Sequence, residues 1–237
     1  MLALIASVVT VALATASLFY FRDISGTTQR SFHKIPFIDA QIKYQGYLLA
    51  FASFVAIVTW VLNPTNFRTL FRLGDLSAPA EAVTWIGIQE GESWRTVGPS
   101  MCFFITLATA SFVFFQVKSA GGFSVAVFQF LPWIVLFSLT NSFAEEIIYR
   151  LGIIAPSFRL VPSSALLIIS ATVFGAAHVR GMPNGVIGIV MAGFLGWFLA
   201  KSLIETQGMF WAWLIHFTQD IVIFSGLFLI EAKTRDG

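Results

Sequence analysis

The sequence predicts an all-α integral membrane protein, a polytopic bundle of about seven transmembrane helices, from three observations. Of the 237 residues, 57% are hydrophobic and only 11% are charged, whereas soluble domains carry about 25% charged residues. The mean hydropathy is +0.82. The apolar residues are also grouped in runs that approach the length of about 20 residues that a helix needs to cross a bilayer.

Seven segments qualify as spans or come close to doing so. In order, they are residues 1–21, 46–62, 99–117, 133–156, 163–180, 185–204 and 208–230. The first contains Ala14-Thr15-Ala16, which is similar to a signal-peptidase site. No Lys or Arg precedes its apolar run, as a secretory signal would require, so we expect a retained transmembrane helix.

Two longer polar stretches lie in the N-terminal half of the chain. Residues 22–45 carry several basic side chains, and residues 63–98 contain VTWIGIQEGESW, which is typical of an amphipathic turn at the membrane surface. Lys and Arg are divided too evenly between the two sides for the positive-inside rule to set the orientation. The sequence shows no internal repeat, so we expect one integral domain over residues 1–237.

The fourth span has two possible boundaries. Hydropathy alone favours residues 124–143, which would leave two glutamates at the lipid–water surface. However, Pro132 fits the first turn of a helix, where its missing N–H group costs nothing. We therefore expect a helix over residues 133–156, with Glu145 near its middle and 121–131 as a short interfacial connection.

Charge and cysteine content exclude several function classes. The formal net charge of +2 is spread over short loops, so the clustered basic face of a nucleic-acid-binding protein is not expected. The single cysteine, Cys102, rules out an internal disulfide and any multi-cysteine metal site.

The last span carries an ionisable pair inside an apolar run. His216 and Asp220 are spaced i, i+4, so their side chains project from the same helical face. A charge near the centre of a span costs about 2.5–3.5 kcal/mol, so such residues are functional candidates. The alternative is a pair that only holds helices together.

The fourth span contributes Glu145, Glu146 and Arg150. Arg150 is at i+4 from Glu146, so we expect a salt bridge between them. Glu145 lies about 100° away around an ideal helix and has Tyr149 at its own i+4 position, which leaves it available as a base. Alternatively, the three charges form an ordinary helix end at the membrane surface.

The fifth span ends in Phe174-Gly-Ala-Ala-His178, whose small residues would allow another helix or a substrate backbone to approach closely. Alone, this histidine would be an interfacial residue. Together, however, two histidines, two glutamates and one aspartate lie on three spans. If these spans pack together, the side chains could activate a water, bind a metal or relay protons.

Three short motifs occur in order: Glu145-Glu146-Ile-Ile-Tyr-Arg150, Phe174-Gly-Ala-Ala-His178 and His216-Phe-Thr-Gln-Asp220. They match the EExxxR, FxxxH and HxxxN/D motifs, and the chain resembles the CPBP intramembrane protease family, also named the Abi or CAAX-protease family. The resemblance covers about residues 125–225. It implies a catalytic core at 125–230, with residues 1–124 forming N-terminal helices and loops.

The resemblance also implies roles for the motif residues. Glu145 and His178 would activate the attacking water, Glu146 and Arg150 would support Glu145, and His216 and Asp220 would stabilise or orient the tetrahedral intermediate. Family members are described as metalloproteases, although metal-independent chemistry is also consistent with the residues. A divalent metal such as zinc would be bound by His178, His216 and Glu145.

Asp220 departs from the asparagine that is common in the family at this position. An ionised carboxylate only accepts hydrogen bonds, so Asp220 would orient His216 or bind a metal rather than donate to an oxyanion, unless burial keeps it protonated.

We therefore expect an intramembrane endopeptidase of the cell (plasma) membrane. Its partners would be the bilayer and a membrane-associated or lipidated protein or peptide substrate, without nucleic acid. Bacterial relatives are linked to bacteriocin immunity and peptide maturation, and eukaryotic members remove three residues from prenylated CAAX proteins. The alternatives are a transporter that uses the same Glu, His and Asp residues as a proton relay and an inactive adaptor that retains the motifs for packing.

Overall fold

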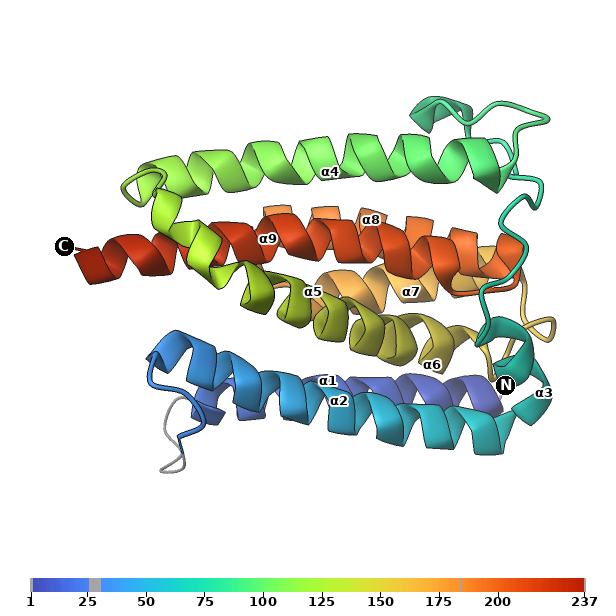
Figure 1. Cartoon of the computed structure of the whole chain (residues 1–237). Helices are drawn as coiled ribbons and strands as arrows, with labels where there is room; N and C mark the ends of the chain where they lie inside the picture. Colours follow the sequence, from blue (N-terminus) through green and yellow to red (C-terminus); the bar gives the residue numbers. More distant parts are fainter. Residues whose placement is uncertain (1, 26–30, 184, 237) are drawn as a thin grey trace.

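A computed structural model describes residues 2–25, 31–183 and 185–236, which fold almost entirely into helices (Figure 1). The α-helices are α1 (Leu2–Ser25), α2 (Pro36–Leu62), α3 (Pro64–Leu70), α4 (Trp94–Ser119), α5 (Leu131–Glu145), α6 (Gly152–Ile154), α7 (Ser163–Ala177), α8 (Gly185–Thr206) and α9 (Phe210–Asp236). Short 3₁₀ turns cover Thr84–Ile86 and Val125–Phe130, and a π-helix covers Glu146–Leu151.

Six helical segments of the described residues are long and apolar enough to cross a membrane, and the predicted all-α membrane bundle is confirmed. They are Leu2–Ile24, Pro36–Leu62, Trp94–Ser119, Val125–Ile154, Gly185–Thr206 and Phe210–Ala232. The remaining predicted span, 163–180, forms the 15-residue helix α7, which is about 22 Å long. It is shorter than predicted because the chain leaves the helix at His178 and turns through Gly181 and Pro183.

The second span begins ten residues earlier than hydropathy predicts, at Pro36 instead of residue 46. Its first turns contain charged residues that are paired and buried. Asp39 forms an ion pair of 2.7 Å with Lys43 and accepts the backbone N–H groups of Phe32 and His33. Hydropathy treats such residues as exposed because it cannot account for their partners.

The fourth span follows the interpretation that starts from Pro132. Pro132 lies in the first turn of α5, and helical structure continues from Leu131 through the π-helix to Ile154. Glu145 therefore lies inside the span and not at a surface end, as predicted. The π-helix that begins directly after Glu145 was not predicted.

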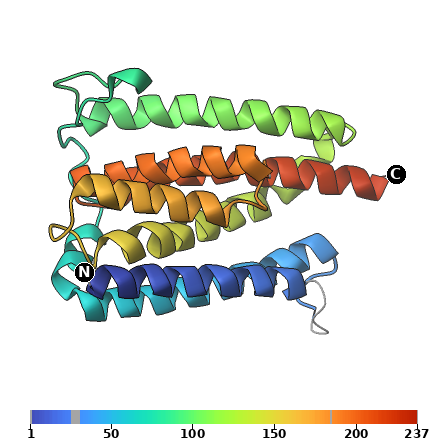
Figure 2. The same ribbon diagram turned by 180° about the vertical axis from the view of Figure 1, so that it is seen from behind.

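The helices run nearly parallel or antiparallel to one another in one bundle. Figures 1 and 2 show α1 and α2 along one side, α4 along the opposite side, and α5, α7, α8 and α9 between them. α7 and α8 approach closely because Gly175 lies against the backbone of Ile189, where a Cβ atom would be 2.7 Å from the carbonyl oxygen. This confirms that the small residues before His178 permit close helix approach.

The loop between α3 and α4 contains the predicted amphipathic turn. Two isolated bridges, Pro79–Ser93 and Val83–Ile88, close it into a compact unit. Trp85 is 71% exposed, whereas Ile88 is buried.

Candidate active site

The structure brings together all six side chains that the sequence singled out as catalytic candidates. They come from the α5–π-helix segment, the end of α7, and α9: Glu145, Glu146, Arg150, His178, His216 and Asp220. The third histidine of the sequence, His33, lies outside this group and contacts Trp133, with 5.3 Å between the ring centroids.

Glu145 faces both histidines through one oxygen. Its Oε2 atom lies 3.8 Å from His178 Nε2 and 3.7 Å from His216 Nε2. This oxygen is buried and has no hydrogen-bond partner within the protein. The other oxygen, Oε1, accepts a hydrogen bond of 3.2 Å from the side-chain amide of Asn141. Glu145 is thus anchored on one side and open toward the imidazoles on the other.

The partners of the two Nδ1 atoms orient both imidazoles. His178 Nδ1 lies 2.8 Å from the carbonyl oxygen of Phe174, which can only accept, so Nδ1 carries the hydrogen. His216 Nδ1 lies 2.7 Å from Glu146 Oε1 and donates to it in the same way. In both rings Nε2 is therefore the atom presented to Glu145.

The predicted Glu146–Arg150 ion pair is present, with 2.9 Å between Arg150 Nη2 and Glu146 Oε1. Both side chains are buried, and the Arg150 guanidinium lies 3.8 Å from the centre of the Phe174 ring. The guanidinium N–H groups are not aligned for hydrogen bonds to protein acceptors, so charge and stacking hold Arg150. Through Glu146, the pair fixes His216, while Glu145 is held by Asn141.

Phe174, the first residue of its motif, is a platform for the site. Its ring lies 4.2 Å from the His178 ring and 5.6 Å from the His216 ring, measured between centroids. Together with the Arg150 contact, these distances show that the Phe174 ring packs against three side chains of the site.

Sequence reasoning missed the amide network that orients the carboxylates. Asn141 donates to Glu145 Oε1 and, at 3.1 Å, to Asp220 Oδ2. Gln45 of α2 donates to Asn141 Oδ1 at 3.4 Å and accepts from the Thr140 hydroxyl at 2.8 Å. Asn141 lies one turn before Glu145, and this spacing is the only sequence signal that could have identified it.

Asp220 accepts from Asn141 and also lies 3.8 Å from His216 Nε2 through Oδ1. The i, i+4 pairing predicted for α9 therefore occurs. An asparagine amide is also present beside Asp220, although it comes from α5 and not from position 220.

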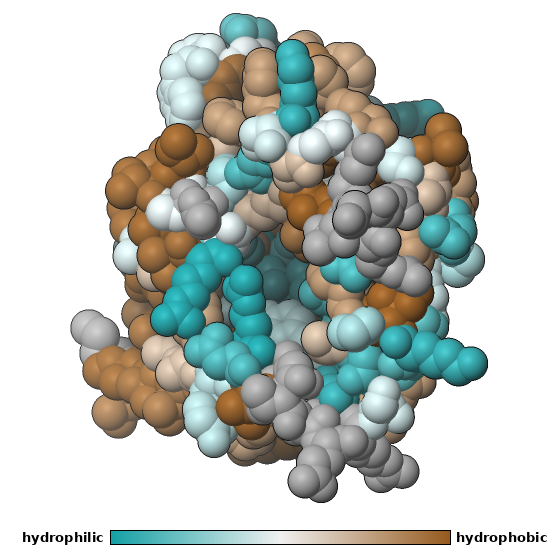
Figure 3. All heavy atoms as spheres, turned by 90° about the vertical axis from the view of Figure 1, so that its left-hand side faces the viewer, coloured by the Kyte–Doolittle hydropathy of each residue, from teal (hydrophilic) through white to brown (hydrophobic). Residues whose placement is uncertain are grey.

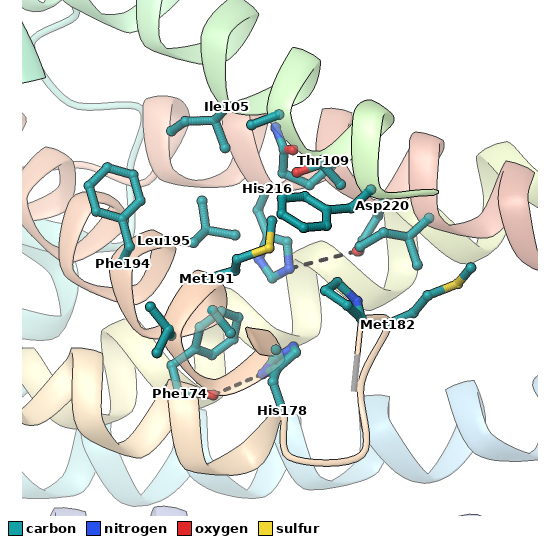
Figure 4. Close-up of a pocket in the computed structure, with 18 of the residues that line it drawn as sticks. Ile105, Thr109, Phe174, His178, Met182, Met191, Phe194, Leu195, His216 and Asp220 are labelled. Atoms are coloured by element: carbon teal, nitrogen blue, oxygen red, sulfur yellow. Dashed lines mark hydrogen bonds and ion pairs between the residues drawn. The ribbon is translucent and has the colours of Figure 1, made fainter. Parts of the chain in front are cut away.

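A mainly apolar cavity of about 510 Å³ adjoins the site between α4, α7, α8 and α9 (Figure 4). Its walls include Ile105 of α4 and Phe194 and Leu195 of α8. The close-up shows His178 and His216 at the cavity, with Asp220 beside His216. The cavity volume is in the range of ligand pockets, about 300–1,000 Å³.

The donor types of His178, His216 and Glu145 suit zinc, but their arrangement does not form a metal site. Glu145 Oε2 lies 3.8 Å from His178 Nε2 and 3.7 Å from His216 Nε2. Within residues 2–25, 31–183 and 185–236, no group of three His, Cys, Asp or Glu side chains could hold a metal ion. The predicted metal requirement therefore stays a prediction, and no step below depends on a metal.

Comparison with known proteins gives one match. A family described as type II CAAX prenyl endopeptidase Rce1-like matches residues 127–222. Neither a search of curated proteins nor a search of solved structures gave a match. The matched residues contain all three motifs, whereas α1, α2 and α4 lie outside them. The match supports the resemblance to the CAAX-protease family that the motifs indicated: over residues 127–222 the chain is similar to the type II CAAX prenyl endopeptidase Rce1-like family.

Proposed function

We propose that this protein is an intramembrane endopeptidase that hydrolyses a peptide bond in a membrane-associated or lipidated protein or peptide. The observation that carries the proposal is the buried Oε2 of Glu145, which faces the Nε2 atoms of His178 and His216 at 3.8 and 3.7 Å. A water molecule between them would donate one hydrogen bond to Glu145 and another to an imidazole. Such a water is positioned for general-base activation.

In the proposed reaction, Glu145 accepts a proton from the water while the water oxygen bonds to the substrate carbonyl carbon. His178 orients the water through Nε2. The tetrahedral intermediate collapses as the C–N bond breaks, and the proton held by Glu145 passes to the leaving nitrogen. We assign stabilisation of the oxyanion to His216 in its doubly protonated form, in which Nδ1–H donates to Glu146 and Nε2–H donates to the oxyanion.

The apolar cavity suits the substrate that we propose. Most of its lining residues are hydrophobic, and polar side chains gather where it meets His178, His216 and Asp220. An apolar chain in the cavity would bury hydrocarbon and bring an attached peptide bond to the polar end. This fits a lipid-modified or strongly apolar peptide segment.

The direct test compares the protein C-termini of membranes from a wild-type strain and a Glu145→Gln strain. We expect defined C-termini to disappear in the variant, and the purified wild-type protein to regenerate them. A matched control is Glu90→Gln, which changes an exposed glutamate. Normal cleavage by purified Glu145→Gln would refute the proposal, and Glu145-dependent ion flux without a peptide product would favour a transporter.

The metal prediction needs its own experiment. Purified protein is treated with a chelator and then supplied with zinc, and cleavage is measured at each stage. Loss and recovery of cleavage would support a metal held by His178, His216 and Glu145. Unchanged cleavage in a protein shown to be metal-free would support the water mechanism above.

A further inference from the structure

A second, smaller pocket lies on the other side of Glu145. Its volume is about 110 Å³, and its walls come from α1, α2, the helix around Glu145 and the loop after α7. They are Thr15, Leu18, Phe19, Arg22, Tyr44, Glu145, Tyr149, Ala177, His178 and Gly181. We name it the α1 pocket. His178 lines both this pocket and the apolar cavity, so the site lies between the two.

About half of the α1 pocket wall is polar, whereas the wall of the large cavity is mainly apolar. Hydroxyl groups of Thr15, Tyr44 and Tyr149 are among its lining groups, and the Glu145 carboxylate lies at its inner end. The Thr15 and Tyr149 hydroxyl oxygens are 3.1 Å apart. Because Thr15 has one hydroxyl hydrogen and bonds the Val11 carbonyl at 2.8 Å, Tyr149 is the donor between them. Groups of this kind can bind water along the pocket.

The pocket extends from the charged end of α1 into the bundle. Arg22 is exposed at that end, and Thr15 lies seven residues deeper, a distance of about 10 Å along a helix. Figure 3 looks onto this end of the molecule and shows a central hollow with hydrophilic residues at its bottom. Because exposed Arg22 and buried Glu145 both line it, the pocket connects the depth of Glu145 with the polar surface.

Contacts between α1 and the loop after His178 fix the outer part of the pocket. Arg22 Nη1 donates to the carbonyl oxygen of Arg180 at 3.1 Å, and Arg180 Nη1 lies 3.3 Å from Asp23 Oδ2. These reciprocal contacts place α1 against the segment that carries His178. α1 is outside residues 127–222, so the family match gives it no role.

We infer that the attacking water reaches Glu145 through the α1 pocket, while the apolar part of the substrate occupies the cavity between α4 and α8. Hydrolysis needs water while the substrate is bound, and a substrate that fills the apolar cavity would obstruct that side. Access from the opposite side removes this conflict. The inference rests on the proposed function for the reaction, although the water path can be tested without any cleavage.

Thiol labelling tests the path directly. In a Cys102→Ser background, Thr15→Cys places a thiol of similar size in the pocket. Leu13→Cys is the matched control, because Leu13 is 64% exposed on the outside of the same helix. In liposomes, a small charged methanethiosulfonate should label Thr15→Cys about tenfold faster or more, since only a thiol in contact with water forms thiolate. Equal or slower labelling would overturn the inference.

A second measurement connects the path with catalysis. Thr15→Phe fills the pocket, so we expect kcat to fall while KM stays near the wild-type value, because the substrate binds on the other side. Thr15→Ser should retain kcat, and Leu13→Phe serves as the control for a larger side chain in α1. Unchanged kcat in a folded Thr15→Phe protein would overturn the path. If the wild type cleaves nothing, the proposed function fails, and labelling still decides the path.

Discussion

The matched core and the helices outside it contribute different things to the site. Residues 127–222 supply the histidines and carboxylates that face one another in the site. The N-terminal helices supply neutral groups and walls: Gln45 fixes the amide of Asn141, Thr15 contacts Tyr149, and α4 closes the apolar cavity. The motifs therefore define the reacting groups, while the environment that orients them comes from helices without a motif.

This division follows from the cost of burying charge. Three carboxylates and one guanidinium are buried in the site, and each needs partners that compensate for lost hydration. The motif residues partly compensate one another, but the remaining hydrogen bonds come from amides and hydroxyls.

The largest effect is expected for the general base. Glu145→Gln keeps the Asn141 contact but cannot accept the proton of the water, so kcat should fall by at least about 100-fold. Protein levels and the thermal unfolding temperature in detergent should stay near those of Glu90→Gln. Retained kcat would refute the proposed mechanism, in which Glu145 is the base.

The buried ion pair should dominate stability. Arg150→Met leaves Glu146 without its cation and should lower the free energy of unfolding by about 3–5 kcal/mol. Arg68→Met, at an exposed position on α3, is the control. Both are compared by denaturant or thermal unfolding in the same detergent. A loss below about 1 kcal/mol is typical of an exposed ion pair. It would mean that the buried Glu146 carboxylate does not depend on the Arg150 cation for its stability.

Much of this core could be predicted because charges inside apolar runs are conspicuous. Glu145, His216 and Asp220 stand out from sequence alone, and Pro132 correctly located the start of α5. The π-helix after Glu145 could not be predicted, since no local pattern distinguishes it from an α-helix. The length of α2 was underestimated because Asp39 and Lys43 neutralise each other only in the folded chain.

The neutral parts of the site were missed for a different reason. Residues such as Thr15, Gln45 and Asn141 are ordinary within membrane helices, where a hydroxyl or amide often bonds its own helix. Their importance depends on which helix lies opposite, and sequence spacing cannot show that across separate spans. The apolar cavity likewise forms between α4, α7, α8 and α9, whose relative positions the sequence does not show.

An intermediate effect is expected outside the core. Gln45→Leu removes the donor to Asn141 Oδ1, so the amide can rotate away from Glu145 and Asp220. Loss of this orientation should lower kcat about tenfold with little change in KM. Ser53→Ala, at an exposed position on the same helix, should behave as wild type. Wild-type kcat in Gln45→Leu would indicate that the core orients its carboxylates unaided.

The smallest effect concerns the far wall of the apolar cavity. Ile86, in the 3₁₀ turn of the loop before α4, lines this cavity together with Met101 and Phe194. If the cavity holds an apolar chain, Ile86→Ala should relax the limit on chain length, and Ile86→Trp should tighten it. The effect should be about fourfold in KM per methylene, as expected for about 0.8 kcal/mol of burial.

The measurement is KM for a series of synthetic peptides that differ only in the length of an attached alkyl chain. The control is Thr84→Ala, an exposed residue of the same turn. A change in preferred length with unchanged kcat means that a loop outside the matched core selects the substrate without touching the chemistry. If all variants show the same dependence of KM on alkyl-chain length, the alkyl chain does not contact Ile86. Selectivity for chain length would then depend on residues of the matched core, which also carry out catalysis.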